Sequence, residues 1–124
     1  MIFGFGKKKA AAAPSLDLRR DGVGFADVTT EDEVDAAVAA GRLEWFWLTA
    51  PQFGGPELPM NRLAGPPGVA AAREWIDDQI SLALQRGEQV SGGGDMTYDD
   101  GGSRVPRVVT YDFGAVGRFV LNFW

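Results

Sequence analysis

The six residues Leu43-Glu44-Trp45-Phe46-Trp47-Leu48 hold three aromatic rings and two leucines. In an extended chain the side chains alternate between two faces, so the two tryptophans share one face and Phe46 lies on the other. Both faces are then mainly apolar, which is typical of a strand that is covered on two sides. The hexapeptide therefore predicts an interior β-strand around which the rest of the chain packs.

The chain has 124 residues, of which 45% are hydrophobic and 23% charged. This length and composition are typical of one globular domain with a single core. Histidine and cysteine are both absent, which excludes disulfides, thiolate metal sites and the commonest general base. The sequence shows no convincing catalytic constellation, and we expect no cofactor.

The formal net charge of −5 is distributed unevenly along the chain. The three lysines lie at positions 7–9, whereas the chain from Pro14 onward has nine arginines against 17 acidic residues, a formal charge of −8. A surface of this sign repels nucleic-acid phosphate and attracts basic proteins. We therefore expect a basic protein partner and no contact with nucleic acid.

Residues 1–14 are predicted to form a flexible tail, followed by a single domain over residues 15–124. Phe3 and Phe5 beside the lysines also suggest a weak membrane anchor over residues 2–9, because each lysine contributes about 1 kcal/mol at an anionic surface. No segment approaches the roughly 18 continuous apolar residues of a membrane span, and no export signal is recognisable. We expect a cytoplasmic protein.

Two helices and an N-terminal hairpin are predicted in the domain. Asp21-Gly22 is a two-residue turn signal, which predicts a hairpin over residues 15–28. Thr30 and Glu33 form a capping box, which predicts a helix from about residue 31 to 40 with Gly41 after its end. Apolar residues recur at helical spacing over residues 69–86, which predicts a longer second helix.

Residues 49–68 contain five prolines and four glycines. This density excludes regular helix and strand pairing, so a long loop is predicted. Long loops in compact domains are often functional. The apolar side chains of the loop either plug it onto the core, which we favour, or remain displayed for a partner.

The C-terminal part is predicted to be extended. After a flexible glycine join at residues 92–94, a second hairpin is expected over residues 96–105, and two alternating segments predict strands over residues 107–113 and 118–124. The predicted fold is a single α+β domain, with a largely antiparallel sheet and two helices on one face. Its predicted order is β-β-α-β-(long loop)-α-β-β-β.

Two glycine- and aspartate-rich segments are candidate ligand sites. Asp95, Asp99 and Asp100 are weak candidates for a cation site, but their spacing does not match an EF-hand loop and a solvated turn is the simpler interpretation. Gly92-Gly93-Gly94 follows a helix instead of a strand, so it is not a phosphate-binding loop.

Other charged and aromatic groups admit structural interpretations. Asp78 could form a carboxylate pair with Asp77 or Glu74, but we expect all three on the solvated face of the second helix. The arginines at positions 104, 107 and 118 could clamp an anion or pair with carboxylates across strands. The four tryptophans could line a stacking pocket, but we assign them to the core.

The leading hypothesis is a non-catalytic interaction protein, of the inhibitor or immunity type, that binds a basic partner through loop 49–68 or the edge of helix 69–86. The candidate partner-binding residues are Phe53, Leu58, Met60, Arg62, Trp75 and Leu82. The first alternative is a small-molecule-binding or hydrolytic enzyme with a pocket under loop 49–68, which requires convergent polar groups and a carboxylate with a shifted pKa. The second alternative is a peripheral membrane protein that uses residues 2–9.

Overall fold

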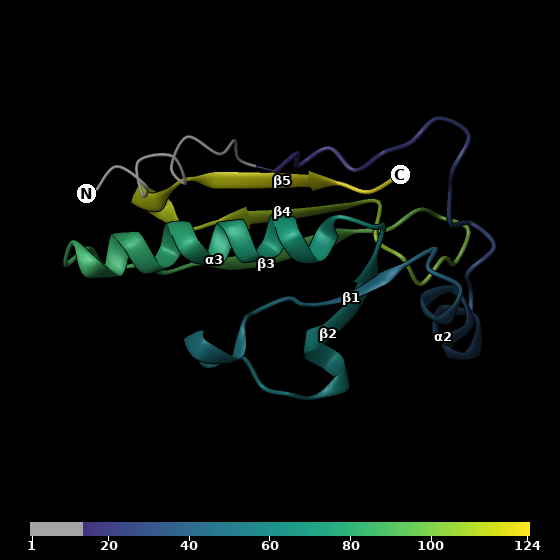
Figure 1. Cartoon of the computed structure of the whole chain (residues 1–124), viewed down its shortest axis with the longest axis horizontal. Helices are drawn as coiled ribbons and strands as arrows, with labels where there is room; N and C mark the ends of the chain where they lie inside the picture. The colour runs from purple at the N-terminus through teal and green to yellow at the C-terminus, as the bar shows by residue number, and fades with distance from the viewer. Residues whose placement is uncertain (1–13) are drawn as a thin grey trace, which may run out of the picture.

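The computed structural model describes residues 14–124, and there the chain folds into an α+β domain with two antiparallel sheets (Figure 1). The predicted α+β class is confirmed. The predicted tail and membrane anchor lie outside the described residues, apart from Pro14. The helices are α2 (Glu31–Ala39) and α3 (Val69–Gln85), the strands are β1 (Glu44–Trp47), β2 (Arg62–Gly65), β3 (Gly93–Thr97), β4 (Val108–Asp112) and β5 (Arg118–Asn122), and the 3₁₀ turns are η1 (Pro51–Phe53), η2 (Pro59–Asn61) and η3 (Gly114–Val116).

Strand β1 confirms that the hexapeptide is extended, but its predicted interior position is wrong, because β1 pairs with β2 alone and only Phe46 of its four residues is buried. Leu43 and Phe46 are buried, and α3 lies against β1 as expected. However, β1 pairs with β2 in a separate two-stranded sheet, whereas β3, β4 and β5 form the larger sheet. The two sheets meet in the core, where the rings of Phe46 and Phe123 contact edge to face with centroids 5.7 Å apart.

The long loop contains a strand that the sequence analysis did not predict. Strand β2 lies between Pro59 and Pro66, and because it contains no proline its residues keep the N–H groups that pair with β1. Buried Asn61 holds the base of the remaining loop. Its Oδ1 accepts from Thr49 N at 2.9 Å, and its Nδ2 donates to the carbonyls of Thr49 and Pro56 at 2.8 and 2.9 Å.

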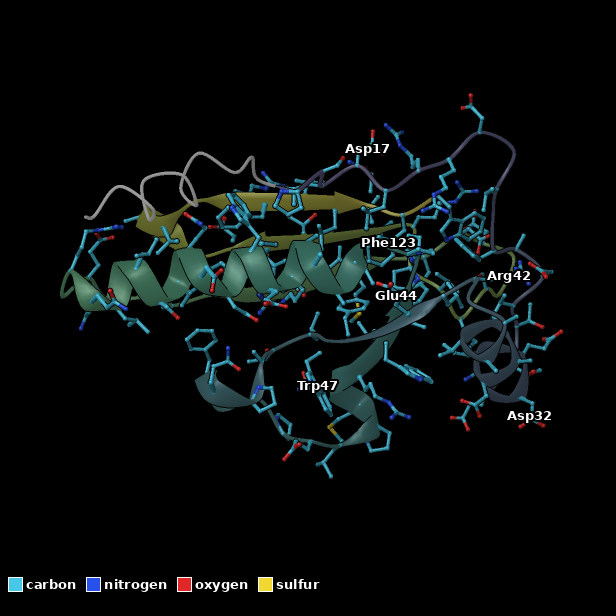
Figure 2. The ribbon with its side chains drawn as sticks, viewed as in Figure 1. Asp17, Asp32, Arg42, Glu44, Trp47 and Phe123 are labelled. Atoms are coloured by element: carbon cyan, nitrogen blue, oxygen red, sulfur yellow. The ribbon has the colours of Figure 1, made fainter. Side chains whose placement is uncertain are left out.

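The residue before helix α3, Gly68, has no side chain with which to cap the helix. Glu44 of β1 supplies the missing acceptor, because its Oε1 accepts from Gly68 N at 3.1 Å and from Ala70 N at 3.3 Å. A carboxylate at a helix N-terminus also interacts favourably with the helix dipole. Figure 2 shows Glu44 between β1 and the first turn of α3. The hexapeptide therefore fixes the start of α3 as well as its packing.

Helix α2 forms as the capping box predicts. Thr30 Oγ1 accepts from Glu33 N at 3.1 Å, Glu33 Oε1 accepts from Thr29 N at 3.0 Å, and Gly41 follows the helix at φ 78°. The sequence pattern predicts both helices on one face of a single sheet. In Figure 1, α3 runs along the three-stranded sheet, and α2 lies beyond the end of that sheet, beside β1.

The predicted N-terminal hairpin is wrong, although its turn at Asp21-Gly22 is present. The segment before the turn lies beside β5, where Leu18 N donates to Asn122 O at 2.8 Å. The segment after the turn takes Phe25 and Val28 into the core. Its carbonyls accept from distant residues, Ser103 Oγ and Arg104 N. Pairing with remote partners thus replaces pairing between the two arms.

Strands β4 and β5 confirm the two C-terminal strands, and Val109, Tyr111 and Leu121 are buried on the side that faces the core. The second hairpin differs from the prediction. Its first strand, β3, begins within the predicted glycine join and pairs with β4. Residues 103–105 do not form the return strand, because Ser103 Oγ bonds Phe25 O and Val105 N inside the core.

Candidate functional site

The predicted partner-binding residues of the loop divide between its exposed tip and the core. Leu58 and Met60 remain exposed at the tip, at 51% and 78%. Phe53 packs against the core and lines a cavity. Arg62 is exposed on β2, and its guanidinium carbon lies 4.1 Å above the ring of Trp45. The loop is therefore plugged at Phe53 and displayed at Leu58 and Met60.

The two predicted residues of helix α3 have different surroundings. Trp75 is half-buried and meets Phe119 of β5 edge to face, with ring centroids 5.8 Å apart. Leu82 is exposed by 47% and does not line the surface grooves around the loop tip. The structure thus does not bring Leu82 together with Leu58 and Met60.

A groove of about 430 Å³ connects the loop tip to helix α2. Trp45, Pro59 and Leu63 supply apolar surface, and Glu31 and Asp35 supply carboxylates from α2. Arg62, Tyr98 and Arg104 also line this groove. We call the set of Leu58, Met60, Trp45, Glu31 and Asp35 the tip surface.

A second cavity, of about 420 Å³, lies under the first turn of the long loop. The loop contributes Thr49 and Phe53, α3 contributes Arg73 and Ile80, and β4 contributes Tyr111. The glycines at the start of β3 complete one wall. A Cβ at position 94 would lie 2.9 Å from the Tyr111 ring, so glycine is needed there for Tyr111 to pack.

Arg73 and Asp77, one helical turn apart on α3, form a buried ion pair beside this cavity. Arg73 Nη1 and Asp77 Oδ1 are 2.5 Å apart without the alignment of a hydrogen bond. Asp77 is only 8% exposed, so its predicted solvation is wrong, whereas Glu74 and Asp78 are exposed as expected. The buried face of α3 is wider than the apolar stripe indicates. Burial raises the pKa of Asp77, and the Arg73 charge opposes that rise.

Tyr111 and Arg73 both point donors at the last residue of the hexapeptide. Tyr111 Oη donates to Leu48 O at 3.1 Å, and Arg73 Nε donates to the same carbonyl at 3.4 Å. The Arg73 guanidinium carbon lies 4.6 Å above the Tyr111 ring. Burial raises the pKa of Tyr111 to about 12, so its hydroxyl remains protonated at neutral pH.

The cavity wall brings together the polar groups of Arg73 and Tyr111, whereas Asp77, the carboxylate with a raised pKa, lies beside the cavity and does not line it. Chemically the cavity can bind and orient a ligand. The cavity is less suited to proton transfer, because Asp77 contacts Arg73 and Tyr111 is neutral. Sequence reasoning missed Arg73; its spacing of four residues from Asp77 was the available signal.

The weak cation-site candidates do not converge. In the described part of the chain, no group of three acidic side chains is placed to hold a metal ion. Asp95 and Asp100 are exposed, and Asp99 is half-buried. Asp95 lies in strand β3, whereas Asp99 and Asp100 follow it in the turn, so the three do not build a coordination sphere.

The three C-terminal arginines do not form an anion clamp in the structure. Arg107 lies 4.0 Å above the Trp124 ring and donates to the Trp124 carbonyl at 3.1 Å. Arg118 is the cross-strand partner of Asp112 in the β4–β5 ladder, as the structural interpretation predicts. Arg104 lines the groove beside α2. Each arginine thus has a different environment.

Comparisons with protein families, with curated proteins and with solved structures give no match. Within residues 14–124, neither helix has the length and apolar composition that crossing a bilayer requires.

Proposed function

We propose that the chain is a non-catalytic interaction domain that binds a basic protein partner through the tip surface. An inhibitor or immunity protein that neutralises a cationic enzyme is one such case. The observation that carries this proposal is the exposure of Leu58 and Met60 on either side of Pro59, next to a groove that contains an indole. Adjacent apolar side chains beside a groove are typical anchors of protein interfaces.

Charge supports a basic partner. Helix α2 has four acidic residues among its nine and no basic residue. Glu31 and Asp35 line the groove, and Figure 2 shows Asp32 directed away from the body of the domain. Arg62 and Arg104 reduce this charge locally, but the described chain as a whole has nine arginines against 17 acidic residues. Such a field accelerates association with a cationic protein and weakens at high salt.

Photo-crosslinking from position 60 tests the proposal directly. A benzoylphenylalanine that replaces Met60 should crosslink to a basic protein in extract of the source cell, and crosslinking should decrease as salt is raised. The double variant Leu58→Ser/Met60→Ser should bind the purified partner at least tenfold more weakly, because it removes the apolar anchors. Glu31→Gln/Asp35→Asn should slow association and reduce its salt dependence.

Leu82→Ser is the matched control, because Leu82 is an exposed leucine that lies off the tip surface. It should bind the partner as the natural chain does. The proposal would be overturned if the partner bound the Leu58→Ser/Met60→Ser variant as tightly as it binds the natural chain and if its affinity were the same at low and high salt.

A further inference from the structure

We propose that the cavity between η1, α3 and β4 is a binding site for a small apolar monocarboxylate, whose carboxylate is held by Arg73. This site is separate from the tip surface, and it does not depend on the proposed partner.

The cavity suits a compact apolar body. Its volume of about 420 Å³ is within the usual range for small-molecule sites. Its wall consists largely of apolar and aromatic side chains: Leu48, Phe53, Ile80, Leu84, Val90 and Phe113. Burial of an aryl or alkyl group against these side chains would favour binding through the hydrophobic effect.

Among the lining residues, Arg73 is the charged one, and its donors are not all used. Nε donates to Leu48 O, and Nη1 contacts Asp77. Within residues 14–124, Nη1 has no aligned hydrogen-bond acceptor, although Arg73 lines the cavity. The side chain as a whole is only 5% exposed. A guanidinium in the wall of a largely apolar cavity is best satisfied by an anionic oxygen.

Asp77 determines how strongly Arg73 can bind an anionic ligand. Its carboxylate is the counter-ion of Arg73, but burial raises its pKa, so the ionised form is held less favourably than in water. A ligand carboxylate would compete with Asp77 for the same guanidinium. Removal of the Asp77 charge should therefore strengthen the binding of an anionic ligand, whereas a structural ion pair without a ligand role gives no such gain.

Phenylacetate is a suitable probe, with 2-phenylethanol as the uncharged analogue of the same shape. Titrations followed by NMR and calorimetry should show saturable binding of phenylacetate, with shifted amide signals at Phe53, Gly93 and Tyr111. The alcohol should bind about tenfold more weakly, because it lacks the charge-assisted contact. Asp77→Asn should bind phenylacetate more tightly than the natural chain, by about three- to tenfold.

The double variant Arg73→Met/Asp77→Leu keeps the interior filled and removes both charges, so it should fold. In this variant the affinity for phenylacetate should fall to that for the alcohol. Arg86→Met is the control, because Arg86 is an exposed arginine at the C-terminal end of the same helix and does not line the cavity, and it should bind as the natural chain does. Equal affinity of the double variant and the natural chain, or no binding to folded Asp77→Asn, would overturn the inference. Signal shifts confined to the tip surface would overturn it as well.

Discussion

At the scale of single residues, the buried Arg73–Asp77 pair is the least expected feature of the molecule. Charged groups are rarely buried unless they are paired, and a buried pair often stabilises less than apolar residues of the same volume. Here the pair lies between the core stripe of α3 and the Tyr111 ring. Its titration should therefore be visible in the stability of the whole domain.

The first prediction concerns pH. Folding raises the pKa of Asp77 above its ordinary value of 3.8. At a pH between the unfolded-state pKa and the raised folded-state pKa, the folded state therefore binds more protons than the unfolded state. The Asp77 contribution to the free energy of unfolding must then decrease as pH rises through this window. The free energy of unfolding of the natural chain minus that of Asp77→Asn, measured by urea unfolding from acid to neutral pH, should therefore decrease as pH rises. A difference that increases with pH would contradict this assignment.

The second prediction concerns Asn61, which makes three side-chain hydrogen bonds across the base of the loop. Asn61→Ala leaves the backbone groups of Thr49 and the Pro56 carbonyl without these partners. Each buried unsatisfied group costs about 1–3 kcal/mol, so we expect a loss of at least about 2 kcal/mol in the free energy of unfolding. Glu57→Ala, at an exposed position of the same loop, should change it by less than about 0.5 kcal/mol. Urea unfolding followed by circular dichroism measures both.

At the scale of elements, β1 and α3 depend on each other. Helix α3 has no capping side chain at Gly68, and Glu44 takes that role from β1. The interaction of the Glu44 charge with the helix dipole and the Glu44 hydrogen bonds should contribute separately to the stability of the domain. A substitution in the strand should thus loosen the first turn of a helix whose N-cap, Gly68, lies 24 residues later along the chain.

The third prediction separates these two contributions. Glu44→Gln keeps an acceptor oxygen and loses the charge, so it should destabilise the domain by about 0.3–1 kcal/mol. Glu44→Ala loses both and should cost about 1 kcal/mol more. Amide exchange at residues 68–70 should become faster in both variants, and more so in Glu44→Ala than in Glu44→Gln. Equal effects of the two substitutions would mean that the hydrogen bond contributes little.

Local signals predicted the elements whose partners are close in sequence. The Thr30–Glu33 capping box, the apolar period of α3 and the alternation in β4 each predicted an element that the structure contains. The N-terminal hairpin failed because Leu18 and Phe25 bond to remote residues of the chain. Strand β2 was missed because the surrounding prolines outweighed a short proline-free segment.

The candidate site was less predictable than the fold. The exposure of Leu58 and Met60 depends on how the Asn61 hydrogen bonds fold the loop back, and a residue pattern does not encode that geometry. Arg73, the partner of Asp77, lies over the ring of Tyr111 from β4, and that ring packs against Gly94 of β3. Such contacts join residues that are far apart in sequence, so spacing alone could not reveal them.

At the scale of the whole molecule, the two sheets share one core. Phe123 contacts Phe46 of the smaller sheet, and a Cβ at Gly65 would lie 2.9 Å from its ring. This close approach joins the end of β5 to the β1–β2 pair. The sheets should therefore unfold together.

The fourth prediction tests this coupling. Phe123→Ala removes a buried ring and should lower the free energy of unfolding by about 3–5 kcal/mol. Both sheets should still be lost in one transition, which residue-resolved NMR in urea can follow at Ala64 and Val109. Val120→Ala, at an exposed position of β5, should cost less than about 1 kcal/mol. Separate transitions for the two sheets would show that they are independent units.

Each of the four tryptophans, at positions 45, 47, 75 and 124, keeps part of its surface accessible. Their intrinsic fluorescence should therefore respond to events at the surface as well as to unfolding. Trp45 lies in the groove beside α2, whereas Trp75 lies against β5. A quencher such as iodide or acrylamide should thus report occupation of the groove through Trp45 without any added dye.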